Sequence, residues 1–231
     1  MKLTNLRIYI FLISFFIAIF CYGQLCEPYG ICTGTEGSSE RLTLLNRYTG
    51  SAPLSVKFFA NPNKDCSPDV KFEWHFIEDS NPKKSFLIRY EQNTEFTFLR
   101  TGSYKIILYE LLGNDTIQVY DPLIISISES ELSIPNAFSP NGDGINDIYR
   151  VKKGFKSIVE FRAIIFNRWG VKLYEWDSPL GGWDGKYKGK NVPEGVYYVI
   201  VKAKGADGRI FNIRSDVNLL RSFEKTQDFN R

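Results

Sequence analysis

The sequence is poor in the residues that catalytic and metal sites most often use. It has one histidine, His75, and four cysteines with no Cys-x-x-Cys spacing among its 231 residues. The missing spacing leaves zinc-binding and thioredoxin-like functions without a motif. A Ser–His–Asp or Cys–His site would have to use His75, and no Gly-x-Ser-x-Gly motif accompanies it. Glu73, Glu78 and Asp79 are candidate carboxylates for glycoside hydrolysis, but a solvated turn explains them equally. We interpret His75 as a solvent-facing strand residue and predict that the protein is not an enzyme.

The sequence contains no long run of residues with one sign of charge. The net charge is +3 at pH 7, and Lys2 and Arg7 supply two positive charges within a predicted signal peptide. The mature chain is therefore close to neutral, whereas nucleic-acid-binding proteins present a clustered basic surface. No phosphate-cradling loop or nucleotide-binding fingerprint is present either. We predict no nucleic-acid partner.

The first 23 residues have the three parts of a secretory signal peptide. Two positive residues come first, and residues 8–20 form an apolar stretch that is too short for a comfortable membrane span. Small residues follow at the positions that the cleaving peptidase reads, so we predict cleavage before Gln24. A lipoprotein would instead be modified at Cys21, but Phe20 stands where a small residue is usual.

Three cysteines remain after the predicted cleavage: Cys26, Cys32 and Cys66. An exported chain meets an oxidising compartment, so all three are disulfide candidates. Cys26 and Cys32 are close in sequence and form one candidate pair. Cys66 is equally a candidate to join the N-terminal segment to the first domain. Three unpaired thiols are the alternative if the outer compartment lacks an oxidising system, and the sequence leaves the choice open.

The composition and the spacing of turns favour β-structure. Aromatic residues make up 15% of the chain, and short alternating stretches recur between turns with no helical periodicity. We predict an all-β chain of two tandem immunoglobulin-like β-sandwiches after a cleaved signal peptide. The expected division is a signal peptide at 1–23, an irregular lead-in at 24–41, a first sandwich at 42–130, a second module at 131–221 and a polar tail at 222–231.

Three motifs in the first sandwich carry a family resemblance. They are Gly50-Ser51-Ala52-Pro53-Leu54-Ser55-Val56, Phe72-Glu73-Trp74-His75-Phe76 and Thr101-Gly102-Ser103-Tyr104-Lys105-Ile106. Together they resemble the PKD-type immunoglobulin-like domain, a sandwich with a Trp in its middle strand and a Gly-x-Tyr entering a late strand. The resemblance implies a binding or spacer unit, for which we expect a glycan or another surface molecule as the ligand.

Five motifs follow one another in the second module. They are Pro135-Asn136-Ala137-Phe138-Ser139-Pro140-Asn141-Gly142-Asp143-Gly144-Ile145-Asn146-Asp147, Ile165-Phe166-Asn167-Arg168-Trp169-Gly170, Trp183-Asp184-Gly185, Pro193-Glu194-Gly195-Val196-Tyr197-Tyr198 and Leu219-Leu220-Arg221. This set resembles the gliding-motility-associated C-terminal domain of Bacteroidetes proteins, which is the type B sorting domain of the type IX secretion system.

The second resemblance implies export across the outer membrane, followed by display at the cell surface or release. It also implies recognition by the secretion channel and its shuttle proteins and, for some members, a porin-like outer-membrane partner. We therefore expect the C-terminal module to address the chain and the PKD-like module to be the cargo. The alternative is a non-enzymatic accessory subunit at the outer membrane, acting in gliding motility or adhesion.

The loop that opens the second module is a candidate calcium site. Hard cations take several oxygens at alternating positions around a sharp turn. Asn141, Asp143, the carbonyl of Ile145 and Asp147 have that pattern. The alternative is a turn rich in Asn and Asp that needs no metal, because these side chains bond their own backbone. Calcium is the one cofactor that the sequence suggests.

Large aromatic and basic residues in the second module are further candidates for recognition. Trp169, Trp176 and Trp183 would form a stacking surface for a sugar or a partner, or they would pack in the core and hairpins. Arg168 and Arg221 would be exposed recognition points for the secretion machinery, or they would form surface salt bridges.

Overall fold

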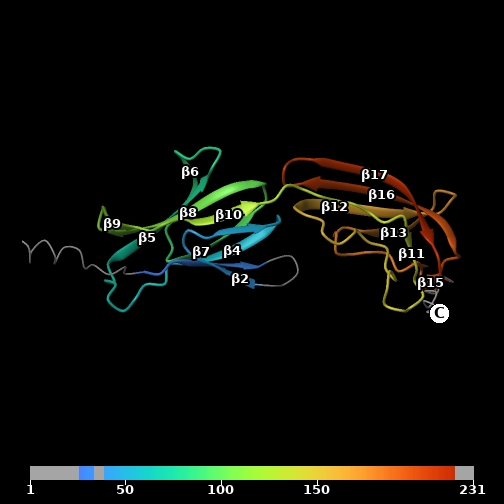
Figure 1. Cartoon of the computed structure of the whole chain (residues 1–231), viewed down its shortest axis with the longest axis horizontal. Helices are drawn as coiled ribbons and strands as arrows, with labels where there is room; N and C mark the ends of the chain where they lie inside the picture. The colour runs from blue at the N-terminus through green and yellow to red at the C-terminus, as the bar shows by residue number, and fades with distance from the viewer. Residues whose placement is uncertain (1–25, 34–38, 222–231) are drawn as a thin grey trace, which may run out of the picture.

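The computed structural model describes residues 26–33 and 39–221 (Figure 1). Within these ranges the regular structure consists of strands, which confirms the predicted all-β class. The described part of the chain contains no helix that is long and apolar enough to cross a membrane. The predicted signal peptide and the predicted polar tail lie outside the described residues. Figure 1 shows the two modules end to end along the long axis of the molecule.

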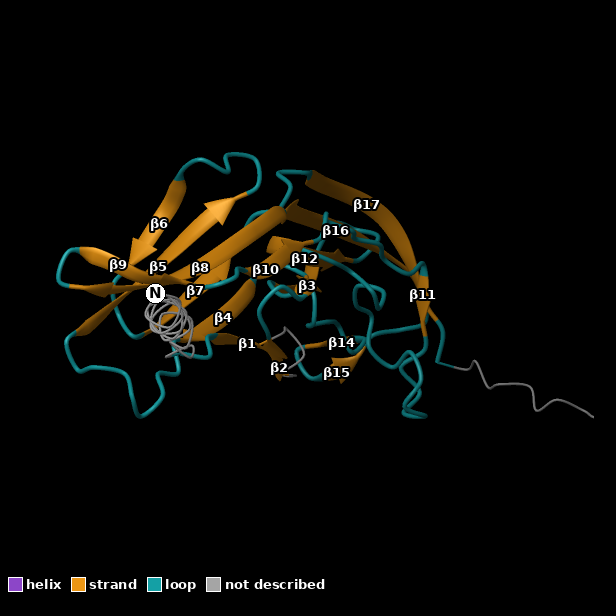
Figure 2. Cartoon of the chain, turned by 60° about the vertical axis from the view of Figure 1, so that its left-hand side comes forward, coloured by secondary structure: helices purple, strands orange, loops and turns teal. Residues whose placement is uncertain are grey.

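Two sheets that face each other form the first module. One has the order β2 (Ser39–Leu42), β1 (Tyr29–Thr33), β4 (Leu54–Phe59) and β7 (Asn93–Phe98). The other has the order β3 (Arg47–Gly50), β10 (Leu123–Ile127), β8 (Gly102–Leu112), β5 (Val70–Glu78) and β6 (Ser85–Arg89), with β9 (Asp115–Val119) paired to the end of β8. In Figure 2, β1 and β4 lie below β5 and β8. This two-layer arrangement is the predicted sandwich.

Period-two alternation along the strands builds the core of this sandwich. Along β5, Phe72, Trp74 and Phe76 are buried, while the residues between them are partly exposed. Trp74 is fully buried, and its indole N–H donates a hydrogen bond to the carbonyl of Glu91 at 3.1 Å. From the opposite sheet, the ring of Phe58 packs against Trp74 and Phe76, with centroids 5.8 and 5.4 Å apart.

The prediction of an irregular lead-in at 24–41 is wrong for residues 29–33 and 39–41. These residues form β1 and most of β2. β1 pairs with β4 over its whole length, from Tyr29 opposite Phe59 to Thr33 opposite Ser55. Gly30 lies so close to Leu42 that an added Cβ would stand 3.0 Å from a methyl carbon of that leucine. The Gly and Thr content hides the strand pattern, and the packing against β4 stabilises the strand.

A five-stranded sheet forms one layer of the second module. Its order is β11 (Ala137–Phe138), β17 (Ile210–Leu219), β16 (Gly195–Gly205), β12 (Ile158–Phe166) and β13 (Lys172–Trp176). The apolar run at 196–201 lies in β16, between β17 and β12, and therefore in the middle of the sheet. The short hairpin of β14 (Lys186–Tyr187) and β15 (Lys190–Asn191) lies on the opposite side of the module from β16 and β17 (Figure 2).

The two modules touch through the turn between β16 and β17. Ala206, in this turn, is 8% exposed and packs in the core of the first module. Its carbonyl accepts a hydrogen bond from the N–H of Thr101 at 3.2 Å. The hydroxyl of Ser157 accepts a hydrogen bond from the N–H of Ala52 at 3.1 Å. Asp207 binds Ser130, in the segment that joins the modules. We call the contacts of Ser157, Ala206 and Asp207 the inter-module contact.

Candidate functional site

The hairpin turn between β12 and β13, residues 167–170, presents a tryptophan to solvent. Trp169 is 77% exposed. The side-chain oxygen of Asn167 accepts hydrogen bonds from the backbone N–H groups of Trp169 and Val171, both at 3.0 Å. Gly170 has φ +78°, a conformation that favours glycine. The guanidinium of Arg168 lies 5.4 Å from the centre of the Trp169 ring. We call this the Asn167 turn; its bonding holds a large aromatic residue in a fixed, exposed position.

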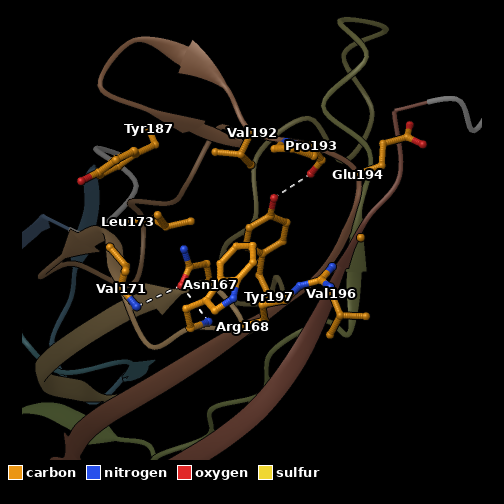
Figure 3. Close-up of a pocket in the computed structure, with 12 residues that line it drawn as sticks. Asn167, Arg168, Val171, Leu173, Tyr187, Val192, Pro193, Glu194, Val196 and Tyr197 are labelled. Carbon is orange, nitrogen blue, oxygen red and sulfur yellow. Dashed lines mark hydrogen bonds between the residues drawn. The ribbon is translucent and has the colours of Figure 1, made fainter.

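A groove of about 260 Å³ lies beside the Asn167 turn (Figure 3). The hydroxyl of Tyr197 donates a hydrogen bond to the carbonyl of Pro193 at 2.7 Å, which fixes the position of the tyrosine ring in the groove. Burial raises the pKa of this hydroxyl. Arg168 and Glu194 add one charge of each sign to the rim. The apolar lining comes from three segments of the chain: Val171 and Leu173, Tyr187 and Val192, and Val196 and Tyr197.

Arg221 joins the end of β17 to the loops around this groove. Its guanidinium donates hydrogen bonds to the carbonyls of Val192 and, at 2.8 Å, of Gly185. Its backbone N–H donates to a carboxylate oxygen of Glu194 at 2.5 Å. Arg221 is half-buried and bonds carbonyl groups. Arg221 therefore joins two loops of the module, and its predicted role in recognition or in a surface salt bridge stays a prediction.

The loop that opens the second module is closed by its own side chains. The two carboxylate oxygens of Asp147 accept hydrogen bonds from the N–H groups of Gly142 and Gly144, at 2.6 and 2.8 Å. Asp143 accepts one from the N–H of Ile145 at 2.7 Å. These are the local bonds of turns built by Asn and Asp. These bonds close the loop without a metal.

The four predicted calcium ligands, Asn141, Asp143, Ile145 and Asp147, all lie on this loop. The carbonyl of Ile145 faces the hydroxyl of Ser139 at 3.4 Å. Throughout the described ranges, no group of three or more His, Cys, Asp or Glu side chains is placed to hold a metal ion. The geometry favours the turn interpretation, and calcium binding stays a prediction for titration to test.

The three tryptophans of the second module do not form one surface. Trp183 is fully buried, and its ring packs against Phe138 and Tyr197 with centroids 5.3 and 5.1 Å apart. Its indole N–H donates to the carbonyl of Lys186 at 2.8 Å. Trp176 is 8% exposed. Core packing therefore explains these two, and only Trp169 remains as a candidate for stacking on a partner.

The remaining motif residues fall into three groups. Those in or next to the core are Phe138, Trp183, Gly185 and Tyr197. Those that are half-buried are Pro135, Ser139, Pro140, Asp147, Phe166, Asn167, Asp184, Gly195 and Arg221. Those that are exposed are Asn136, Asn141, Gly142, Asp143, Gly144, Asn146, Arg168, Trp169, Gly170, Pro193 and Tyr198. Most of the motif residues therefore shape loops and turns, and the Asn167 turn presents the largest exposed side chain among them.

His75 makes two polar contacts on the outer face of the first module. Its Nδ1 lies 3.0 Å from the hydroxyl of Ser85, and its Nε2 lies 3.2 Å from a carboxylate oxygen of Glu73. The ring of Tyr109 lies 4.4 Å from the imidazole. These residues do not line the groove beside the Asn167 turn or the two cavities between the modules. The arrangement is a polar pairing on a sheet face, outside these three pockets.

Sequence reasoning does not find the apolar lining of the groove. Leu173, Tyr187 and Val192 belong to separate segments and are not among the motif residues. Leu173 lies on β13, whose register with β12 shifts between Ile165 and Phe166. A register shift of this kind leaves no sign in the spacing of apolar residues.

The candidate site is therefore an exposed turn beside an apolar groove on the second β-module. Residues 132–212 match the family model CHU_C, the type IX secretion signal domain. The second module belongs to this family, which confirms the predicted sorting domain. The match means that the chain is exported by the type IX secretion system, that it interacts with that machinery, and that it ends at the cell surface or outside the cell. The first module lies outside the matched residues.

Comparison with curated proteins found no match. Similar solved structures include the chicken CNTN1 FN1-FN3 domains, with 9% identity, 79% of this chain and 75% of that chain covered, and a TM-score of 0.27. The fibronectin(III)-like modules of Clostridium thermocellum CbhA have 13% identity, cover 80% and 95%, and have a TM-score of 0.23. Dimeric latent PorU from Porphyromonas gingivalis has 10% identity, covers 84% and 20%, and has a TM-score of 0.27. At these TM-scores the likenesses support no conclusion about this chain.

Proposed function

We propose that the second module carries the first to the cell surface, where the first acts as a non-enzymatic binding unit of the PKD type. The observation that carries the proposal is the type IX secretion signal domain at residues 132–212. A chain of this design needs one part that the exporter reads and one part that is useful outside. The first module has its own hydrophobic core and is the part available for a role outside the cell.

We assign recognition by the secretion machinery to the Asn167 turn and its groove. Exposed tryptophan and arginine side chains are the commonest residues to dominate protein–protein binding. Trp169 and Arg168 stand together on a turn whose bonds are already made, so little conformational freedom is lost on binding. The groove beside them offers an apolar surface of about 260 Å³ for a side chain or a short segment of the partner.

A binding role for the first module is supported by the exposed apolar residues of β6. This strand is at the edge of its sheet, so it can pair with another chain. Phe86 is 46% exposed, and its ring lies beside those of Phe76, Phe96 and Tyr104. Tyr90, one residue beyond the strand, is 67% exposed. An aromatic edge of this kind fits a glycan or a protein at the surface, including a porin-like outer-membrane protein.

The proposal is tested with the full chain in a host that has a type IX secretion system. Surface antibody labelling of the first module would be compared between the full chain and a chain stopped after Glu129. We expect labelling, or release into the medium, for the full chain and retention in the periplasm for the shortened one. Retention of the full chain in the periplasm would overturn the proposal. Co-purification of an outer-membrane protein with the surface form would identify the partner.

A further inference from the structure

The N-terminal segment of the described chain runs extended along β4. Cys26 forms an antiparallel bridge with Pro62, Tyr29 lies opposite Phe59, and Cys32 lies opposite Val56. An extended chain rises about 3.3 Å per residue, so the six steps from Cys26 to Cys32 span about 20 Å. A disulfide requires Cα atoms within about 7 Å of each other. The register therefore excludes the Cys26–Cys32 pair that the sequence spacing suggests.

Cys66 returns to the same end of the segment as Cys26. The chain turns after Pro62, and the N–H of Cys66 donates a hydrogen bond to the carbonyl of Asn63 at 3.3 Å. Cys26 pairs with Pro62, four residues before Cys66, and Cys66 packs against the core cluster that contains Cys26. Each thiol also shifts the pKa of the other, and the Cys66 thiol lies 3.8 Å from the carbonyl oxygen of Ser67. Cys26 is fully buried, whereas Cys66 is partly exposed at the margin of the first core. Two thiols far apart in the sequence are therefore neighbours, and one of them faces solvent.

A buried carboxylate completes the cluster. Glu110 is fully buried, and one of its oxygens accepts a hydrogen bond from the hydroxyl of Tyr120 at 2.9 Å. The same hydroxyl accepts a hydrogen bond from the N–H of Cys26 at 2.9 Å. The other carboxylate oxygen is buried and has no hydrogen-bond partner, and the Tyr120 hydroxyl links the carboxylate to the backbone of Cys26. Burying a carboxylate with an incomplete set of bonds is costly, so its place beside a thiol calls for an explanation.

We propose that Cys26 and Cys66 form a redox pair that closes to a disulfide during export, with Glu110 as the proton acceptor for Cys26. The oxidant is a disulfide-bearing thiol oxidoreductase of the exporting compartment. The thiolate of Cys66 attacks the oxidoreductase disulfide, which gives a mixed disulfide and releases one oxidoreductase thiolate. Cys26 then passes its proton to Glu110 and attacks the sulfur of Cys66. The second oxidoreductase thiolate leaves, and the two thiol protons end on the two oxidoreductase thiols.

The exposure of the two thiols sets the order of these steps. Burial raises the pKa of Cys66 and raises that of Cys26 strongly, with the Glu110 carboxylate adding to the second effect. Little thiolate is therefore present at neutral pH, and small oxidants react slowly. An oxidoreductase reaches Cys66 first because Cys66 is the thiol open to solvent. The Cys26–Cys66 disulfide would join the N-terminal segment to the 61–69 loop, and it would stabilise the first module outside the cell.

The experiment reads the linkage in the exported protein itself. Full chain recovered from a type IX host is alkylated with iodoacetamide and digested with chymotrypsin without reduction. Cleavage after Tyr29 separates Cys26 from Cys32, so mass spectrometry distinguishes every pairing. We expect a peptide that joins Cys26 to Cys66, with Cys32 alkylated. Alkylation of both Cys26 and Cys66, or a linkage through Cys32, would overturn the proposal.

Two cysteine variants test the disulfide itself, and a Glu110 variant tests how it forms. Cys32→Ser should keep the linkage, and Cys66→Ser should lose it and lower Tm by about 10 °C. Reduced full chain is then reoxidised with glutathione disulfide, and loss of free thiols is followed in time. Glu110→Gln should slow closure at least about tenfold without changing the product, because a general base is missing. Closure of this variant at the rate of the unsubstituted chain would overturn the role of Glu110.

Discussion

The carboxylate of Asp207 accepts hydrogen bonds from both the hydroxyl and the backbone N–H of Ser130, 77 residues away in the sequence. The distances are 2.7 Å from the hydroxyl and 3.1 Å from the N–H. Asp207 lies in the turn between β16 and β17 of the second module, and Ser130 lies where the first module ends. The β16–β17 hairpin is therefore bonded directly to the segment that joins the two modules.

Replacing Asp207 with asparagine should weaken this connection. The amide keeps the shape of the side chain but removes the charge that strengthens the bonds. We expect Asp207→Asn to lower the free energy of unfolding by about 1 kcal/mol at pH 7, a low value because the carboxylate is solvent-exposed. Urea denaturation measures the change, and Asp121→Asn, at an exposed position of the first module, is the control. An equal loss in both variants would contradict the prediction.

The effect of Asp207 should also depend on pH. The hydrogen bond from Ser130 lowers the pKa of the Asp207 carboxyl below its usual value. A carboxyl with a lowered pKa in the folded state stabilises the fold above the unfolded pKa of about 3.9, and that contribution is lost as the pH falls through the lower folded pKa. The difference between the unsubstituted chain and Asp207→Asn should therefore shrink below about pH 4. A difference that stays constant down to pH 2 would count against this role.

Replacing Gly205 with alanine should open the contact between Asp207 and Ser130, because the added methyl group would clash with both side chains. An added Cβ would stand 2.2 Å from the hydroxyl oxygen of Ser130 and 2.4 Å from a carboxylate oxygen of Asp207. Both side chains would have to move, so Gly205→Ala should expose the segment that joins the modules. Limited proteolysis measures this as faster cleavage near residue 130. Lys204→Ala, at the exposed neighbouring position, should leave the cleavage rate unchanged.

Trp169→Ala should reduce secretion without reducing stability. Trp169 is 77% exposed, so its removal takes little apolar surface out of the fold. Truncation of a tryptophan that dominates an interface costs about 2 kcal/mol or more in binding, which is roughly a 30-fold loss of affinity. We expect the variant to accumulate in the periplasm with an unchanged Tm. The matched control is Ile210→Ala, which removes an exposed apolar residue on another part of the same module. Normal surface display of Trp169→Ala would exclude the Asn167 turn as the recognition site.

Arg221 should behave in the opposite way, losing stability and secretion together. Its guanidinium bonds two carbonyl groups from separate loops, at Gly185 and Val192. We expect Arg221→Ala to lower the free energy of unfolding by about 2 kcal/mol, because two hydrogen bonds from a charged donor are lost. Arg221→Lys should recover less than half of the loss, since an ammonium group cannot bond both carbonyls in the same geometry. Thermal denaturation and surface labelling measure the two effects. A stable variant that is not secreted would return Arg221 to the role of a recognition residue.

Local sequence patterns predict the elements well where alternation is strong. The apolar residues at 158–166 predict a strand, and the structure has β12 over the same residues; those at 123–128 predict another, which matches β10 to within one residue. The sequence also predicts two separate last strands, at 209–213 and 216–221. The structure has the single strand β17 there, because Arg214 and Ser215 continue the pairing with β16 without a turn. Ser and Asp between two apolar stretches indicate a turn only when the neighbouring strand does not extend past them.

Contacts between distant segments are the part that the sequence does not predict. The Ser130–Asp207 bonds, the packing of Cys66 against the core that contains Cys26, and the lining of the groove each bring together residues tens of positions apart. The register of neighbouring strands decides these contacts, and a shift of one residue reverses which face a side chain occupies. The separation of Cys26 from Cys32 shows this directly, since residues that are close in sequence lie far apart along an extended segment.

The loop at 139–147 offers a prediction that separates its two interpretations. Both oxygens of Asp147 are hydrogen-bonded to backbone N–H groups, of Gly142 and Gly144. Asp147→Asn should therefore lower the free energy of unfolding by about 1–2 kcal/mol with or without metal, because one oxygen and the charge are lost. Millimolar calcium should leave Tm unchanged in the unsubstituted chain, since those oxygens already have partners. A rise in Tm with calcium that disappears in Asp147→Asn would instead establish a cation site, with the N–H groups of Gly142 and Gly144 giving way to the metal.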